Sequence, residues 1–311
     1  ERFAESVIVG EAETIWPTVM DDLRHGTLKK RYQGFERPLL EQIRPDRSIF
    51  RGKRYLPIGL VETGRGCRFP CEFCAIQAFF DRTHRTRPVD NILAELQSLK
   101  NSRKVFFFVD DNFIGNKRNV KLLLPLLRQW QIEHGFPFSF ATEASVDLAA
   151  DDDLMQMMVE CRFESVFLGI ETPDESSLET AGKLQNTRSS LEDSVNKITS
   201  YGLRVMAGFI IGFDGEKDGA GRRIVEFVTR TGIPHAMMGM LQALPNTALW
   251  HRLEKEGRLI EGKAAAKGVN QTNLLNFAPT RPIRDIANEY VDAFGALYEP
   301  NAFIDRVYSY F

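Results

Sequence analysis

Short apolar runs alternate with amphipathic stretches through most of the chain. The runs are nearly continuous, as in parallel strands that are buried on both faces of a sheet. Six segments have this pattern: 58–62, 105–109, 138–142, 165–170, 204–211 and 236–241. Apolar residues recur at helical spacing in six further segments: 89–100, 117–134, 152–161, 189–201, 219–231 and 247–256. The alternation predicts an α/β fold of six βα units with right-handed crossovers, which form a partial TIM-like barrel. Because periodicity does not distinguish a closed sheet from an open one, an open doubly wound sheet is the alternative.

The two ends of the chain depart from this rhythm. An apolar run ends at Gly10, and a helical pattern follows at 12–25. One strand and one helix cannot form a domain, so residues 1–30 are expected to be the last βα unit of a truncated N-terminal α/β domain. A βα extension that packs on the barrel is the alternative.

The predicted organisation of the rest follows from the same pattern. Residues 31–54, rich in Arg, Pro and Gln, are predicted to be a linker, and residues 55–256 the barrel. Residues 257–311 are predicted to be a C-terminal helical cap. Within the cap, a small-residue helical patch is expected at 263–267, a polar loop at 270–276 and a helix at 283–297.

Composition excludes several classes of protein. The 311 residues have a formal net charge of −2, so no basic excess indicates a nucleic-acid partner. No run approaches the roughly 18 apolar residues of a membrane span, and the N-terminus does not resemble a signal peptide. We expect a cytoplasmic protein that acts on a small molecule.

Three closely spaced cysteines are the most informative feature of the chain. Cys67, Cys71 and Cys74 form a Cys-x3-Cys-x2-Cys run just after the first predicted barrel strand. Three thiolates can hold three irons of a cubane 4Fe–4S cluster, which leaves one iron free to bind a small molecule. The alternative is a structural zinc site, which usually has four nitrogen or sulfur ligands. The remaining cysteine, Cys161, falls on the apolar stripe of a predicted helix and is interpreted as a core residue.

The cysteine run and several later motifs resemble one enzyme superfamily. The spacing, with Phe73 before the last cysteine, is that of radical S-adenosylmethionine (SAM) enzymes. The chain from about residue 55 to 241 is similar to the subgroup with a cobalamin-binding domain (class B methylase-like), nearest the hopanoid C-2 methylase type. Four segments carry this likeness: Gly64-Arg-Gly-Cys-Arg-Phe-Pro-Cys-Glu-Phe-Cys74, Val109-Asp-Asp-Asn-Phe113, Leu168-Gly-Ile-Glu-Thr172 and Leu241-Gln-Ala-Leu-Pro-Asn-Thr247. The tail, Asn276-Phe-Ala-Pro279 followed by Tyr298-Glu-Pro300, shows the same likeness. The opening segment 7–13 resembles the last strand of the cobalamin domain.

Polar residues follow the predicted strands at the end where barrel enzymes bind their ligands. Asp110, Asp111 and Asn112 are expected to accept hydrogen bonds from the amino group of SAM, and Glu143 or Glu171 from its ribose hydroxyls. Each carboxylate taken alone is also compatible with a helix N-cap.

The adenine of SAM requires a flat apolar surface. Gly208 and Gly212 leave room for it beside Ile210, and these three residues match part of the adenine motif of the superfamily. The acid of that motif, Glu216, comes one residue later than in the usual pattern.

The resemblance implies a reaction as well as a fold. It implies reductive cleavage of SAM at the cluster, with the three cysteines as ligands, and methylation of an unactivated carbon with the help of cobalamin. A lipid-like substrate such as a hopanoid is implied by the same likeness, and so is an electron donor such as a flavodoxin or ferredoxin. Two alternatives remain: another radical SAM outcome, such as rearrangement or cyclisation, and a non-enzymatic zinc scaffold.

Overall fold

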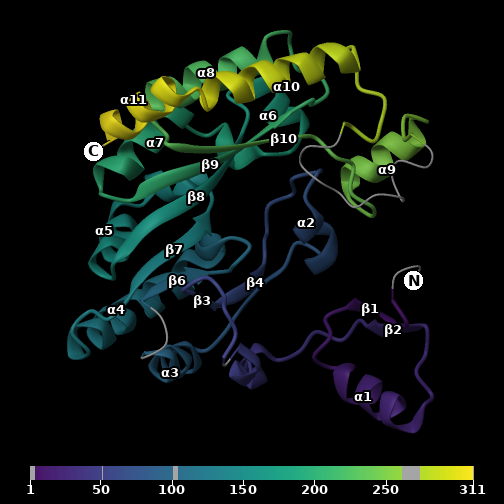
Figure 1. Ribbon diagram of the computed structural model, residues 1–311, viewed down its shortest axis with the longest axis vertical. Coiled ribbons are helices and arrows are strands. Elements are labelled where there is room, and N and C mark those ends of the chain that lie inside the picture. Colours follow the sequence, from purple (N-terminus) through teal and green to yellow (C-terminus); the bar gives the residue numbers. More distant parts are fainter. Residues whose placement is uncertain (1–3, 51, 101–103, 261–273, 311) are drawn as a thin grey trace.

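A parallel sheet of six strands forms the centre of the computed structural model, which describes residues 4–50, 52–100, 104–260 and 274–310. Its strands run in the order β10-β9-β8-β7-β6-β3, and each pairs in parallel with its neighbour. The strand bounds are β3 Ile58–Val61, β6 Val105–Phe108, β7 Ser139–Ala144, β8 Phe163–Glu171, β9 Arg204–Ile211 and β10 His235–Met240. The sheet curves without closing (Figure 1), so the predicted partial barrel of the TIM type is confirmed.

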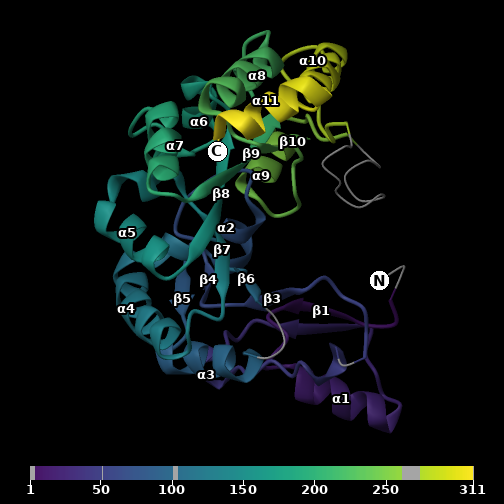
Figure 2. The same cartoon turned by 60° about the vertical axis from the view of Figure 1, so that its left-hand side comes forward.

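Helices follow the strands and cover one face of the curved sheet (Figure 2). The helices of this layer are α3 Val89–Leu99, α4 Lys117–Glu133, α5 Asp152–Glu160, α7 Leu191–Ser200 and α8 Ala220–Thr231. N-cap side chains accept from backbone N–H groups in the first turns of α5 and α7. Asp151 accepts from the Leu154 N–H of α5, and Ser190 from the Asp193 N–H of α7. These caps explain why the helices begin where the amphipathic pattern predicted.

The two faces of the sheet differ in burial. Along β9, Val205, Ala207, Phe209 and Ile211 are buried in the core that the strands share with the helices. The alternate residues point to the opposite, concave face. Because side chains alternate along a strand, the same division is present in β3, β6 and β7.

The C-terminal segment packs against the last barrel unit. Helix α9 Ala248–Lys255 follows β10, and α10 Ile283–Leu297 and α11 Pro300–Tyr310 lie beside α8 (Figure 1). The Glu289 carboxylate of α10 accepts hydrogen bonds from the N–H groups of Gly219 and Gly221 and so caps α8. At Gly221 the helices approach so closely that a Cβ would lie 2.5 Å from the Glu289 carbonyl oxygen. The helix predicted at 283–297 is present, α11 was missed, and the patch at 263–267 and most of the polar loop at 270–276 lie outside the described residues.

The N-terminal segment forms a small unit of its own. Strand β1 Val7–Gly10 is followed by α1 Trp16–His25 and β2 Arg31–Gly34, and the two strands pair in parallel. The unit lies at the β3 end of the large sheet, away from α10 and α11 (Figures 1 and 2). The segment 31–54 was predicted to be a linker, and the pattern missed β2 and the short 3-10 turns η1 Leu40–Gln42 and η2 Ser48–Phe50 within it.

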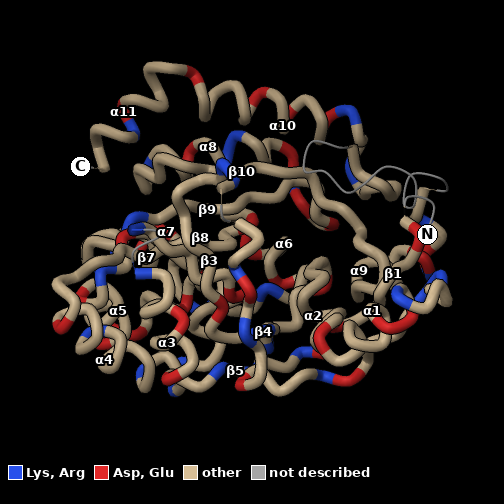
Figure 3. The backbone as a smooth tube through the Cα atoms, turned by 60° about the horizontal axis from the view of Figure 1, so that its bottom comes forward, with Lys and Arg blue, Asp and Glu red and all other residues tan. Residues whose placement is uncertain are grey.

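Charged residues of both signs are distributed over the fold (Figure 3). Within the described part of the chain, no helix is both long and apolar enough to cross a membrane.

Candidate active site

The three clustered cysteines lie on a loop that a small hairpin presents at the end of β3. Strand β4 Gly64–Gly66 pairs antiparallel with β5 His84–Thr86, and the cysteine loop and the short helix α2 Ala75–Phe80 lie between these strands. At Gly66 φ is +92°, and a Cβ would lie 2.1 Å from the Thr83 carbonyl oxygen, so this turn requires glycine. The loop thereby leaves the hairpin directly at Cys67.

The surroundings of the thiols suit an iron–sulfur cluster. All four cysteines have free thiols; Cys71 is buried, and Cys67 and Cys74 are half-buried. Burial raises the pKa of the Cys67 and Cys71 thiols, and the ammonium group of Lys183 opposes this effect at both. Gln185 donates from Nε2 to the Cys71 Sγ at 3.6 Å.

No group of three or more His, Cys, Asp or Glu side chains in the described ranges gathers as ligands for one metal ion. In a cubane cluster each thiolate binds a different iron, which requires separate ligand positions. A positive side chain, a buried amide and three separate thiols are therefore compatible with a cluster held by three cysteines.

The three polar residues after β6 have different partners. Asp110 is buried, and its carboxylate accepts from the Thr63 N–H at 2.6 Å, the Gly64 N–H at 3.1 Å and the Thr63 hydroxyl. Asp111 accepts from the Gly66 N–H at 2.7 Å, and Asn112 donates to the Ser145 hydroxyl at 3.0 Å. Asp110 thus holds the start of the cysteine hairpin, and its predicted contact with SAM stays a prediction.

Burial raises the pKa of both aspartates. The pKa of Asp110 rises to about 7, although three hydrogen bonds to the carboxylate oppose the rise. The pKa of Asp111 also rises with burial, and the hydrogen bond from Gly66 lowers it in part. Asn112 lies close enough to Cys67 to form a side-chain hydrogen bond that lowers the pKa of its thiol.

Glu143 and Glu171, the two predicted ribose contacts, differ in environment. Glu143 is exposed on the concave face, yet partial burial of its carboxyl group and the negative charge of Asp111 raise its pKa. Glu171 is buried at the end of β8, in the left-handed region with φ at 66°, and its Oε1 lies 2.6 Å from the Lys183 Nζ. Burial lowers the pKa of Lys183, but the charges of Glu171, Cys71 and Cys74 outweigh it and raise the pKa.

An apolar cavity of about 430 Å³ opens at the ends of β8, β9 and β10. Its lining includes Phe73 of the cysteine loop, Phe167, Gly208, Ile210 and Met237. A Cβ at Gly208 would lie 3.0 Å from the Phe167 ring, so glycine keeps this wall flat. The Lys183 ammonium group lies 5.9 Å from the centre of the Phe73 ring, which joins the cavity to the cysteine loop.

Gly212 lies away from this lining. Its φ is +103°, and a Cβ would lie 2.9 Å from Leu275 of the C-terminal segment. The Gly212 N–H donates to Glu216 at 2.9 Å, and Glu216 pairs with Arg281 at 3.1 Å. Burial raises the pKa of Glu216 to about 7. Gly212 therefore joins the barrel to the C-terminal segment, and its predicted contact with adenine stays a prediction.

Comparison with known proteins identifies the family. The model of the radical SAM superfamily matches residues 61–228, which is more than half of the chain. The chain belongs to the radical SAM superfamily. The enzymes of this superfamily use SAM and a 4Fe–4S cluster. A second model, a domain of unknown function (DUF4070), matches residues 247–311, the segment that contains α10 and α11.

Similar proteins of this superfamily bear names of methyltransferases. The chain is 61% identical over 254 residues to the uncharacterized methyltransferase sll1242 of Synechocystis, covering 81% of this chain and 47% of that protein. It is 34% identical over 255 residues to the hopanoid C-2 methylase of Rhodopseudomonas palustris, with the same coverage of 81% and 47%. The chain thus spans about half the length of these relatives.

A solved structure shares the fold. The radical SAM methyltransferase TsrM of Kitasatospora setae, with cobalamin and a 4Fe–4S cluster bound, has a TM-score of 0.60 and 14% sequence identity. The match covers 75% of this chain and 46% of that chain.

Two polar residues next to the cysteines of this radical SAM chain were missed in the sequence. Lys183 and Gln185 follow α6 Glu175–Thr180, with Gln185 in the short turn η5 Leu184–Asn186. Both lie more than 100 positions beyond the cysteines, and neither belongs to a periodic pattern. The one local signal was their position shortly after the Glu171 motif.

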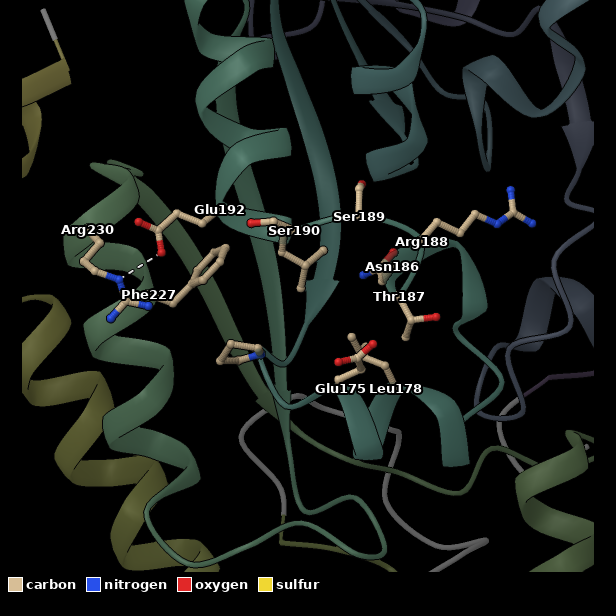
Figure 4. A pocket seen from close by; sticks show the side chains of 12 residues that line it. Glu175, Leu178, Asn186, Thr187, Arg188, Ser189, Ser190, Glu192, Phe227 and Arg230 are labelled. Carbon is tan, nitrogen blue, oxygen red and sulfur yellow. Dashed lines mark hydrogen bonds and ion pairs between the residues drawn. The ribbon is translucent and has the colours of Figure 1, made fainter.

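A second cavity of the radical SAM domain, of about 470 Å³, lies among the helices (Figure 4). Residues from α6, α7 and α8 line it, and Glu192 pairs with Arg230 across it at 2.9 Å. It belongs to the helix layer and not to the concave face that contains the cysteine loop.

Proposed function

We propose that this radical SAM enzyme methylates an unactivated carbon of a large apolar substrate, with cobalamin as the methyl carrier. Cys67, Cys71 and Cys74 are proposed as the three ligands of the cluster. When bound, the reduced cluster would supply the electron that splits SAM into methionine and a 5′-deoxyadenosyl radical. The observation that supports this site is one continuous surface, formed by the cysteine loop, Phe73 and the apolar cavity at the ends of β8 to β10.

The charge of Lys183 favours the thiolate form of the cysteines, against the larger effect of burial. The positive charge of Lys183 opposes the effect of burial on the pKa of Cys71 and Cys67. Its pairing with Glu171 fixes the ammonium group beside the loop. Because thiolates and not thiols bind iron, we propose that Lys183 helps to keep the cysteines ready for the cluster.

The remaining predicted contacts are proposed to orient SAM. Asp111 and Glu143 are the carboxylates of the concave face that would accept hydrogen bonds from the SAM amino group and ribose. Phe167, Gly208 and Ile210 would contact the adenine, and the Phe73 side chain would exclude water from the cleaved bond. In this arrangement the protein supplies binding, orientation and a dry surface, and the cofactors supply the difficult chemistry.

The exposed side chains of the concave face favour an apolar substrate. Large apolar side chains that are not packed in the core lie on it: Ile58 of β3 is 44% exposed, Leu60 49%, Val105 of β6 43% and Met237 of β10 49%. In a closed TIM barrel such inward-facing residues fill a packed core. Here they leave apolar surface exposed on the concave face, and a relative of this chain is named for hopanoids, which are hydrophobic.

Labelled SAM tests the proposed reaction. The whole protein would be reconstituted anaerobically with iron, sulfide and cobalamin, then incubated with reductant, a hopanoid acceptor and SAM labelled in its methyl group. Formation of 5′-deoxyadenosine together with label in the hopanoid is the expected result. Deoxyadenosine with an unlabelled but rearranged or cyclised acceptor would instead support another radical SAM reaction.

A further inference from the structure

The N-terminal unit contacts the cysteine hairpin through a buried carboxylate. Glu11 follows the last residue of β1, and its side chain is 6% exposed. Its Oε2 lies 2.8 Å from Nη1 of Arg65 in β4, and its Oε1 pairs with Nη2 of Arg85 in β5. One carboxylate of the small unit thus binds an arginine of each hairpin strand.

The negative charge of Glu11 offsets the repulsion between the two arginines of the hairpin. Arg65 and Arg85 are directly opposite each other in the antiparallel register of β4 and β5. Like charges at opposed positions destabilise a strand pair. Both side chains are largely buried, at 15% and 22% exposure, so solvent screens their repulsion poorly. Glu11 is the one residue of the described chain that forms ion pairs with both arginines.

The backbone of the small unit fixes the direction of Glu11. Its N–H donates to the Gly34 carbonyl oxygen of β2 at 3.1 Å. A Cβ at Gly34 would lie 2.4 Å from the Glu11 carbonyl oxygen, and one at Gly10 2.1 Å from the Gly34 carbonyl oxygen. The strand ends therefore approach at a distance that only glycine permits, and the position of Glu11 is set by the pairing of β1 with β2.

The position of Glu11 affects the cysteines through the hairpin strand β4. Arg65 lies two residues before Cys67, between Gly64 and Gly66 in β4. It also pairs with Glu62 at 2.7 Å and with Glu13 of the small unit at 2.6 Å. A shift of Glu11 would move the strand from which the cysteine loop leaves.

We propose that Glu11 is a positioning residue that holds the cysteine hairpin in register with the N-terminal βαβ unit, so that the cysteine loop presents the proposed cluster to the cavity at the correct place. The inference rests on the proposed function, because it needs a cluster on the cysteine loop.

Glu11→Gln tests the proposal, with Glu13→Gln as the matched control. The change at position 11 would retain the side-chain volume but remove the charge and place an amide near two arginines. Glu13 makes a single ion pair, and its side chain is 34% exposed. In the whole protein, reconstituted anaerobically with iron and sulfide and supplied with reductant and SAM, two quantities would be compared: the iron content, and the rate of deoxyadenosine formation per bound iron.

The proposal expects Glu11→Gln to bind iron and to form deoxyadenosine about tenfold or more slowly per bound iron, since a misplacement of about 1 Å can cost about a hundredfold. Glu13→Gln should change both quantities little. Hydrogen exchange should speed up in β1, β2, β4 and β5 and stay unchanged in β6 to β10. An unchanged rate per bound iron and unchanged exchange in Glu11→Gln would overturn the proposal.

Two further outcomes remain distinguishable. If Glu11→Gln fails to bind iron, Arg85→Met, which removes the second partner of Glu11 from the strand away from the cysteines, decides the question by the same rate per bound iron. If the wild-type protein forms no deoxyadenosine, the proposed function fails, and the exchange comparison still shows whether Glu11 holds the unit in place.

Discussion

The two faces of the curved sheet are made by the same strands and yet have opposite character. On the helix side, Phe108, Leu168 and Ala207 are fully buried in one core. On the concave side, Leu60 and Met237 remain about half exposed although they are equally apolar. The helix side follows the rule that apolar residues are packed inside. The concave side departs from it, and an apolar surface left open next to reactive groups indicates a binding site.

The largest expected effect distinguishes Cys71, in the cysteine loop, from Cys161, in the helix-side core. Cys71→Ala should abolish iron binding by the three-cysteine loop and reduce deoxyadenosine formation to background, because the proposed cluster loses a ligand. Cys161→Ala is the control: this thiol is fully buried in the helix-side core, where burial raises its pKa to about 12. It should retain iron and activity. Iron content and deoxyadenosine yield, measured side by side, check both variants; equal loss in the two would refute the distinction.

Substituting one leucine on each face compares directly how much the two faces contribute to stability. Leu168→Ala on the helix side should lower the free energy of unfolding by about 2–5 kcal/mol, through lost burial and a residual cavity. Leu60→Ala on the concave side should cost no more than about 0.5 kcal/mol, because the side chain is already half exposed. Urea unfolding of the two variants measures the difference. Similar losses of stability would mean that the concave face is packed like a core.

A single methyl group tests the wall of the cavity. Gly208→Ala would place a Cβ 3.0 Å from the Phe167 ring. Overpacking of this kind costs about 1–3 kcal/mol, so SAM binding should weaken by about tenfold. Gly295→Ala in α10, where nothing lies within 4 Å of the added carbon, is the control. Equilibrium dialysis with SAM provides the measurement, and equal affinity in Gly208→Ala and wild type would place SAM elsewhere.

The smallest expected effect concerns the buried carboxyl group of Asp110. Burial raises the pKa of Asp110 to about 7, and that of Glu216 likewise. A carboxyl group whose pKa is raised in the folded state binds its proton more tightly there than in the unfolded chain. Its contribution to stability is therefore present below about pH 4 and is lost as the pH rises through about 7.

Asp110→Asn should flatten part of this pH dependence. The asparagine keeps an oxygen that can accept from the Thr63 and Gly64 N–H groups and removes the titrating proton. The free energy of unfolding, measured anaerobically from about pH 5 to 8, should fall less with rising pH in the variant than in the wild type. A steeper fall in the variant would contradict the assigned direction of the shift.

The sequence predicted the six large strands and the helices between them because each of these elements is long enough to show a regular apolar pattern. It missed β2, β4, β5, α2 and α6, which have three to six residues each. β4 and β5 contain glycine, arginine and histidine in place of an apolar run, and tertiary contacts hold them. The helix α11 was missed although Phe303, Val307 and Tyr310 recur at helical spacing, because the exposed apolar side chains Ile304 and Tyr308 obscure the pattern.

The candidate site was predictable to a similar degree. The spacing of Cys67, Cys71 and Cys74 is local and was visible in the chain. The different environments of Asp110 and Asp111 were not, since burial and hydrogen bonding arise only when β6 meets the hairpin. Lys183 reaches the cysteines only through the turn after α6, and the ion pairs of Glu11 depend on how the small unit lies against the barrel.

The electron paramagnetic resonance spectrum of the reduced, anaerobically reconstituted protein, recorded with and without SAM, tests the central claim most directly. If Cys67, Cys71 and Cys74 hold a cluster with one open iron beside the cavity, a 4Fe–4S signal should be present and SAM should change it. A reduced protein without a cluster signal, or a cluster signal that SAM leaves unchanged, would contradict the account.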